Sequence, residues 1–113
     1  MASVLQDVSR EQLCELIDRG NLVLVDALSP ISYAASHLPG AINIPPGTEA
    51  ERAPRRIPYQ ESAVVVYCQS PTCDSSMEVG RRLLELGYRN VRHYSGGKDE
   101  WAEAGLPLEG GRV

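Results

Sequence analysis

The stretch Ala63-Val-Val-Val-Tyr-Cys-Gln-Ser-Pro-Thr-Cys-Asp-Ser-Ser76 joins a valine-rich apolar run to a polar loop that contains two cysteines. A continuous apolar run of this kind predicts a strand that is covered on both faces. The run ends on Cys68, and Cys73 follows within the loop. Core cysteines lie inside elements, and zinc-binding cysteines come in closer pairs with partners elsewhere. A cysteine at the tip of a strand, before a loop that leads into a helix, therefore indicates a nucleophile.

Strands and helices alternate on both sides of this stretch. The patterns predict helices over 9–20, 30–36, 75–87 and 97–104, and strands over 22–25, 41–44, 63–67 and 91–94. Capping boxes at Ser9–Gln12 and Ser75–Glu78 mark two of the helix starts. The proline-rich residues 45–60 are expected to form a connecting loop, with room for a short turn of helix.

Apolar strands that alternate with helices predict an α/β domain with a mostly parallel sheet. In such sheets, ligands bind beyond the carboxyl ends of the strands. Cys68 directly follows the strand over 63–67 and is therefore expected at this edge.

The composition predicts one globular domain over residues 1–113, with 42% hydrophobic and 23% charged residues. The net charge of −4 argues against nucleic acid as a partner, because phosphate binding needs a basic face. No apolar run is long enough to cross a membrane, and the first residues lack the pattern of a signal peptide. We therefore expect a cytoplasmic protein whose three cysteines are free thiols.

Three ordered motifs resemble the rhodanese family of sulfurtransferases over residues 9–110. The first motif is Val25-Asp26-Ala27-Leu28, followed by Tyr33 and His37-Leu-Pro-Gly-Ala-Ile-Asn-Ile-Pro45. The second is Val65-Val-Tyr-Cys68. The third is Leu86-Gly-Tyr-Arg-Asn-Val91, followed by Gly96-Gly97, Trp101 and Gly105-Leu-Pro107. The resemblance implies a rhodanese-like three-layer domain, with a mostly parallel sheet flanked by helices. It also implies that Cys68 is the catalytic cysteine and that Asp26 is a hydrogen-bonding scaffold residue.

The loop Cys68–Cys73 has the form C-x-x-P-x-C, which is similar to a subgroup of rhodanese-like proteins. The resemblance implies a sulfurtransferase that moves a sulfane sulfur through a Cys68 persulfide to a thiophilic acceptor, without a cofactor or a metal. The partners expected are a small-molecule or protein sulfur donor and a thiol acceptor. The loop and helix start supply the candidate substrate-binding residues Gln69, Ser70, Thr72, Asp74, Ser75 and Ser76.

A thiolate is the reactive form of cysteine, so the loop is expected to lower the pKa of Cys68. Backbone N–H groups that curl around the sulfur, together with the positive end of the following helix, would do this without a charged side chain. Cys73 has two interpretations at this point: a second catalytic thiol that resolves or accepts the persulfide, or a small loop residue that packs under the turn. Cys14, His37 and Trp101 are interpreted as structural, and His93 could face either side of its strand.

Two other functions compete with sulfur transfer. Phosphatases and arsenate reductases with this fold use a cysteine loop that ends in arginine, because a transferring phosphoryl group needs a cation. Here Asp74 follows Cys73, and no basic residue lies in the loop. The remaining alternative is a non-catalytic rhodanese-like binding or regulatory module. The same lack of a cation predicts weak use of thiosulfate, a dianion, unless Arg55, Arg56, Arg81 or Arg82 reaches the site.

Overall fold

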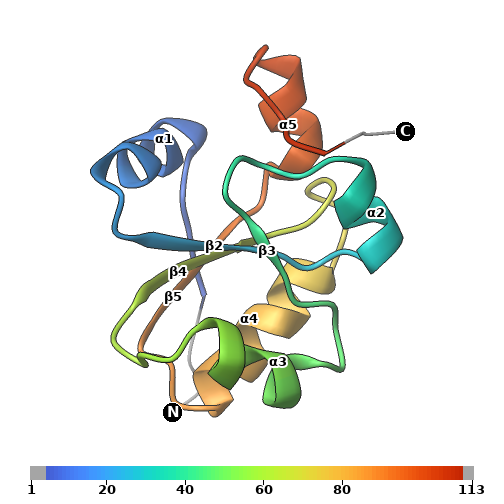
Figure 1. Ribbon diagram of the computed structural model, residues 1–113. Helices are drawn as coiled ribbons and strands as arrows, with labels where there is room; N and C mark the ends of the chain where they lie inside the picture. The colour runs from blue at the N-terminus through green and yellow to red at the C-terminus, as the bar shows by residue number, and fades with distance from the viewer. Residues whose placement is uncertain (1–4, 111–113) are drawn as a thin grey trace.

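The computed structural model describes residues 5–110, and in this part of the chain five parallel strands form one sheet (Figure 1). The strands are β1 (Gln6–Asp7), β2 (Leu22–Asp26), β3 (Ile42–Asn43), β4 (Ala63–Tyr67) and β5 (Asn90–Tyr94), in the order β1-β5-β4-β2-β3. The helices are α1 (Arg10–Arg19), α2 (Pro30–Ala35), α3 (Glu49–Arg56), α4 (Ser75–Glu85) and α5 (Gly97–Glu103). The predicted α/β class with a parallel sheet is confirmed.

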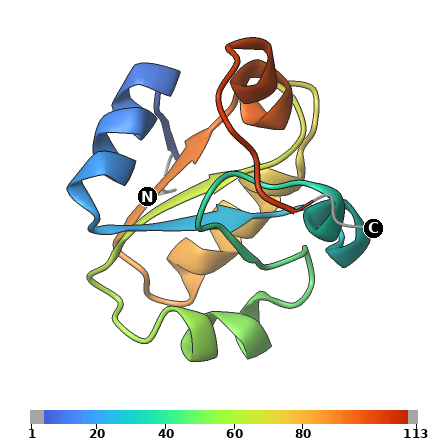
Figure 2. The same ribbon diagram turned by 45° about the horizontal axis from the view of Figure 1, so that its top comes forward.

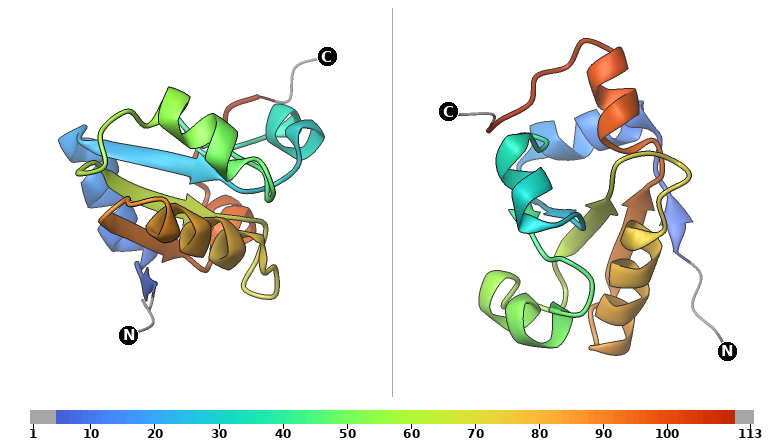
Figure 3. Two further views of the ribbon diagram at one scale, coloured as in Figure 1. Left: turned by 90° about the horizontal axis from the view of Figure 1, so that it is seen from below. Right: turned by 90° about the vertical axis from the view of Figure 1, so that its right-hand side faces the viewer.

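Helices cover both faces of the sheet and make three layers (Figures 1 and 2). Helices α3 and α4 lie on one face, as the view from below shows best, and α1 and α5 lie on the other (Figure 3). The central strand β4 serves both: Val64 and Val66 join the apolar cluster that contains Val79 of α4, and Val65 joins the cluster that contains Trp101 of α5. Two buried faces explain why this strand is apolar throughout.

The start of α1 agrees with the sequence. The Ser9 hydroxyl accepts a hydrogen bond from the Gln12 N–H, and the Gln12 side chain accepts one from the Ser9 N–H, which completes the capping box. Gly20 ends the helix in the left-handed conformation, with φ +79°.

The start of α4 differs from the prediction. Its N-cap is Asp74, no side chain caps it, and the capping box expected at Ser75–Glu78 is wrong. The N–H of Cys73 donates to Ser70 O at 3.0 Å, and this turn leaves Asp74 already in the helical region of φ and ψ. The Glu78 N–H then bonds to Asp74 O, so Ser75 is the first residue of the helix and not its N-cap.

Two further elements exceed the prediction. Helix α3 occupies half of the loop expected over 45–60, although Pro54 lies inside it. Acidic residues in its first turn and arginines in its last turn suit the helix dipole, and Ala53 packs into the core. The short strand β1 was not predicted, because two exposed polar residues, Gln6 and Asp7, carry no strand pattern.

None of the helices in residues 5–110 has the length and apolar character that a membrane span requires.

Candidate active site

The Cys68 loop leaves the carboxyl end of β4, between the ends of β2 and β5. Figure 3, right, shows the loop rising from the tip of β4 and returning into the first turn of α4. All strands of the sheet point toward this edge, because every pair is parallel. The structure therefore places Cys68 where the parallel sheet was expected to place it.

The first turn of α5 holds the beginning of the loop. The Lys98 N–H donates to Cys68 O, and the Asp99 N–H donates to Gln69 O, both at 2.9 Å. The Gln69 side chain adds a third bond, from Nε2 to Asp99 Oδ1 at 2.6 Å. Gly97 adopts φ +69°, and a Cβ atom on it would lie 2.6 Å from Cys68 O. This close backbone approach explains why the second residue of the Gly96-Gly97 pair is glycine.

Cys68 itself is almost completely buried, with 2% of its surface exposed. Its S–H donates to Cys73 O, which lies 3.2 Å from Sγ, and the Ser76 hydroxyl lies 3.4 Å from the same sulfur. Burial raises the pKa of the Cys68 thiol, and the adjacent Cys73 thiol raises it further, against an opposing effect of the Ser76 hydroxyl and N–H. The expectation that the loop lowers the pKa of Cys68 is wrong, because burial of the thiol outweighs the hydrogen bonds of the Ser76 hydroxyl and N–H.

Cys73 lies in the opposite kind of environment. Its side chain is partly exposed on the loop. Burial raises the pKa of its thiol, but hydrogen bonds from the Cys68 thiol, from the N–H groups of Gln69 and Ser75 and from the Ser75 hydroxyl outweigh this effect and lower the pKa overall. Backbone N–H groups, which were expected to favour the thiolate of Cys68, thus favour that of the second cysteine of the loop.

The remaining predicted site residues are divided between the rim and the floor of the loop. Ser70 and Thr72 bond to each other through their hydroxyl oxygens at 3.0 Å, and Thr72 and Asp74 are exposed. Ser76 is 2% exposed and lies beneath Cys68. Cys14, by contrast, is on α1 and packs against the cluster around Leu13 and Trp101, as expected of a structural residue.

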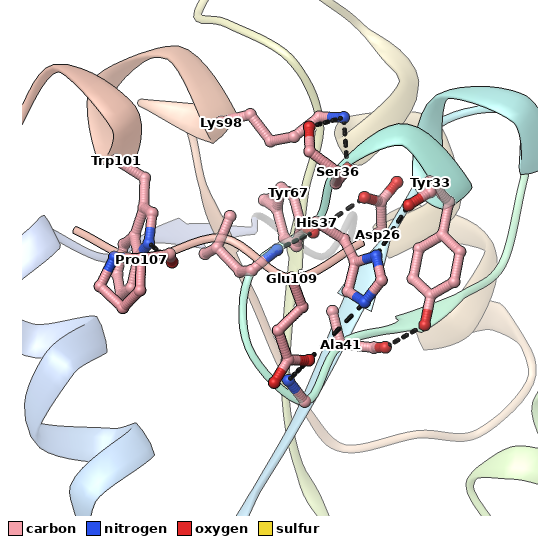
Figure 4. Close-up of polar contacts among 12 residues, drawn as sticks. Asp26, Tyr33, Ser36, His37, Ala41, Tyr67, Lys98, Trp101, Pro107 and Glu109 are labelled. Carbon is pink, nitrogen blue, oxygen red and sulfur yellow. Dashed lines mark hydrogen bonds and ion pairs between the residues drawn. The ribbon is translucent and has the colours of Figure 1, made fainter. Parts of the chain in front are cut away.

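Asp26, at the end of β2, is a buried scaffold residue. Its carboxylate accepts from the Tyr67 hydroxyl and the Leu28 N–H, both at 2.8 Å, and the same hydroxyl accepts from the Leu38 N–H at 2.9 Å. Burial raises the pKa of Asp26, and these two donors and the charge of Lys98 oppose the increase. The network ties β2, β4 and the turn before β3 together behind the loop (Figure 4).

Lys98 is a residue of this region that sequence reasoning missed. Only 5% of it is exposed, and its ammonium donates to Ser36 O at 2.7 Å and to Ser32 O at 3.2 Å, at the end of α2 (Figure 4). Its N–H holds Cys68 O at the same time, so one residue connects α2 to the start of the loop. A lysine in a polar segment carries no sequence signal for burial.

His37 has the structural role expected of it. Its Nδ1 lies 2.7 Å from Tyr33 O, and its ring stacks on that of Tyr33. On the other side, its Nε2 is 3.7 Å from the Glu109 carboxylate, and a backbone bridge joins the two residues. The contact fastens the segment after α5 to the turn after α2.

The profile of the rhodanese-like domain matches residues 9–104. The chain belongs to the rhodanese-like domain family. Among solved structures, this rhodanese-like chain resembles a human single-domain sulfurtransferase at 28% identity and a TM-score of 0.76, over 88% of this chain and 97% of that one. It also resembles a rhodanese from E. coli at 31% identity and a TM-score of 0.66, over 80% and 99% of the two chains.

A curated relative places the same domain in a larger protein. An HTH-type transcriptional regulator of Mycobacterium tuberculosis is 33% identical over 104 residues, which are 92% of this chain and 45% of the relative. The rhodanese-like chain thus spans less than half the length of that regulator. The comparisons together support an enzyme family of the sulfurtransferase type.

Gly97→Ala should destabilise the domain and disturb the Cys68 loop, since the new methyl group would overlap Cys68 O and also force an L-residue into φ +69°. We expect the free energy of unfolding, measured by urea denaturation, to fall by about 2–4 kcal/mol. Gly20→Ala is the matched control, because Gly20 has φ +79° and nothing within 4 Å of its Cβ position. It should cost only about 1 kcal/mol, and equal losses in the two variants would contradict the contact with the loop.

Proposed function

We propose that this rhodanese-like domain transfers sulfane sulfur, with the sulfur held as a persulfide on Cys68. The observation that carries the proposal is the pair of thiols in one loop at the carboxyl edge of the sheet, with Cys68 Sγ next to Cys73. The similarity to a single-domain sulfurtransferase and to a rhodanese supports the same reaction class.

The chemistry needs no cofactor. A thiolate in the loop attacks the outer sulfur of a persulfide donor, the donor's S–S bond breaks, and the donor leaves as a thiolate. An acceptor thiolate then attacks the outer sulfur of the protein persulfide, and the protein cysteine leaves as a thiolate. Each step exchanges one S–S bond for another, so no external oxidant or reductant is consumed.

The electrostatics of the loop support a donor of low charge. Asp74 is exposed beside the thiols, and residues 68–76 contain no cation. Arg81 and Arg82 line a groove of about 710 Å³ next to Asp74, but four carboxylates, of Glu49, Asp74, Glu78 and Glu85, share it. Arg55 and Arg56 line a separate hollow with Glu51 and Arg52. We therefore propose a persulfide on a small molecule or a protein as the donor, and a thiol as the acceptor.

A regulatory module is the second candidate, favoured by the similarity to a transcriptional regulator. In that case the thiols would react once with a sulfur species, and no acceptor would be turned over. Multiple turnovers with a thiol acceptor distinguish the enzyme from the module. Phosphoryl or arsenate chemistry has less support, because Asp74 would repel a dianion at the end of the loop.

Cys68→Ser should abolish sulfur transfer from cysteine persulfide to a thiol acceptor, since the serine hydroxyl cannot form a persulfide. We expect the turnover rate to fall by more than about a thousandfold, measured by acceptor persulfide formation, while circular dichroism and the melting temperature stay near those of the wild type. Cys14→Ser is the control and should retain activity, because Cys14 is on α1 away from the loop. Full activity of Cys68→Ser would contradict the assignment.

Asp74→Asn should improve the use of thiosulfate. Removing one negative charge next to the site should raise kcat/KM for this dianion by about three- to tenfold, measured with cyanide as acceptor, and should change kcat/KM for cysteine persulfide less. Asp18→Asn removes the same charge from an exposed position on α1 and should leave both values unchanged. Wild-type turnover of thiosulfate that matches that of the persulfide would show that charge does not select the donor.

A further inference from the structure

The two thiols of the loop differ in the backbone carbonyl groups that they meet. The Cys68 S–H donates to the carbonyl oxygen of Cys73. The carbonyl oxygen of Ser70 is 4.0 Å from the same sulfur. Carbonyl groups accept hydrogen bonds, so they hold the proton on Cys68. At Cys73, hydrogen bonding by the N–H groups of Gln69 and Ser75 lowers the pKa and so favours the thiolate.

Access to solvent divides the thiols in the same way. Cys68 is 2% exposed and rests on Ser76, whereas Cys73 is partly exposed between two exposed neighbours, Thr72 and Asp74. A donor that approaches the loop from solvent therefore meets the Cys73 sulfur first.

We propose that Cys73 is the entry thiol of this site: it takes the sulfur from the donor and passes it inward to Cys68. The proposal rests on the sulfurtransferase function proposed above and specifies the order in which the two thiols act. It assigns Cys73 a catalytic role and makes Cys68 the second carrier of the sulfur.

The two steps balance without an added reactant. In the first, the Cys73 thiolate attacks the outer sulfur of a donor persulfide, R–S–SH, which gives a Cys73 persulfide and releases the thiolate R–S⁻. In the second, Cys68 Sγ attacks the outer sulfur of the Cys73 persulfide. The S–S bond on Cys73 breaks, a new S–S bond forms on Cys68, and the proton of the Cys68 thiol moves to Cys73.

The arrangement explains the placement of a buried, protonated cysteine at the end of β4. A persulfide on Cys68 would lie under the loop, so that only an acceptor thiol that enters the site can reach its outer sulfur. The Cys73 thiol adjoins Cys68 and can act as the leaving group of the inward step.

The test is the site and rate of first loading with cysteine persulfide, followed by rapid acid quenching, alkylation and peptide mass spectrometry. In the wild type, the extra sulfur should appear on Cys73 first and on Cys68 later. Cys68→Ser should load Cys73 at close to the wild-type rate and keep the sulfur there. Cys73→Ser should load Cys68 at least about tenfold more slowly, because the remaining thiol has the higher pKa. Cys14→Ser is the matched control and should follow the wild type.

The opposite order would overturn the proposal: sulfur on Cys68 first in the wild type, with undiminished loading of Cys73→Ser and none on Cys68→Ser. That result would leave the sulfurtransferase function intact. Absence of sulfur from both cysteines of the wild type would contradict the sulfurtransferase function itself, so the two failures are distinguishable. The wild-type time course keeps the test decisive even if one variant is poorly folded.

Discussion

Two backbone hydrogen bonds from the first turn of α5 determine the shape of the Cys68 loop. The Lys98 and Asp99 N–H groups hold the carbonyls of Cys68 and Gln69, and only a glycine at position 97 allows the helix to come so near. With these two carbonyls facing α5, the chain turns back through Ser70 and Cys73 into α4. That path presents the Cys73 carbonyl to one sulfur and leaves two N–H groups for the other. The chemistry of the thiols follows from this peptide geometry.

The scaffold behind the loop is built on buried polar contacts. The hydrogen bond from Tyr67 to Asp26 connects the ends of β2 and β4, and the Tyr67 hydroxyl also accepts from the Leu38 N–H. The Lys98 ammonium donates to a carbonyl oxygen at the end of α2. Each of these groups would be costly to bury without its partners. Together they fix the elements around the carboxyl edge of the sheet, so that a short loop of small residues can adopt one conformation there.

The fold and the place of the site were predictable, because they depend on local patterns. The valine run over 63–67 and the alternation of strands with helices are sufficient to predict a parallel sheet with Cys68 at its edge. The electrostatics of the loop were not predictable. Whether an N–H or a carbonyl meets a sulfur depends on the turn at Ser70–Cys73 and on α5, far along the chain. The cradle was therefore expected at Cys68, and Lys98 was overlooked because burial of its ammonium requires carbonyls of α2.

Sulfur entry through Cys73 requires a proton on Cys68 and a negative charge on Cys73, and a thiol titration measures this difference most directly. Cysteine labelled at Cβ would report the ionisation of each thiol by NMR as the pH of the reduced wild-type protein is raised. We expect the Cys73 resonance to shift first, below the pH at which an ordinary cysteine ionises, and the Cys68 resonance to shift only above it. Ionisation of Cys68 before Cys73 would contradict the account.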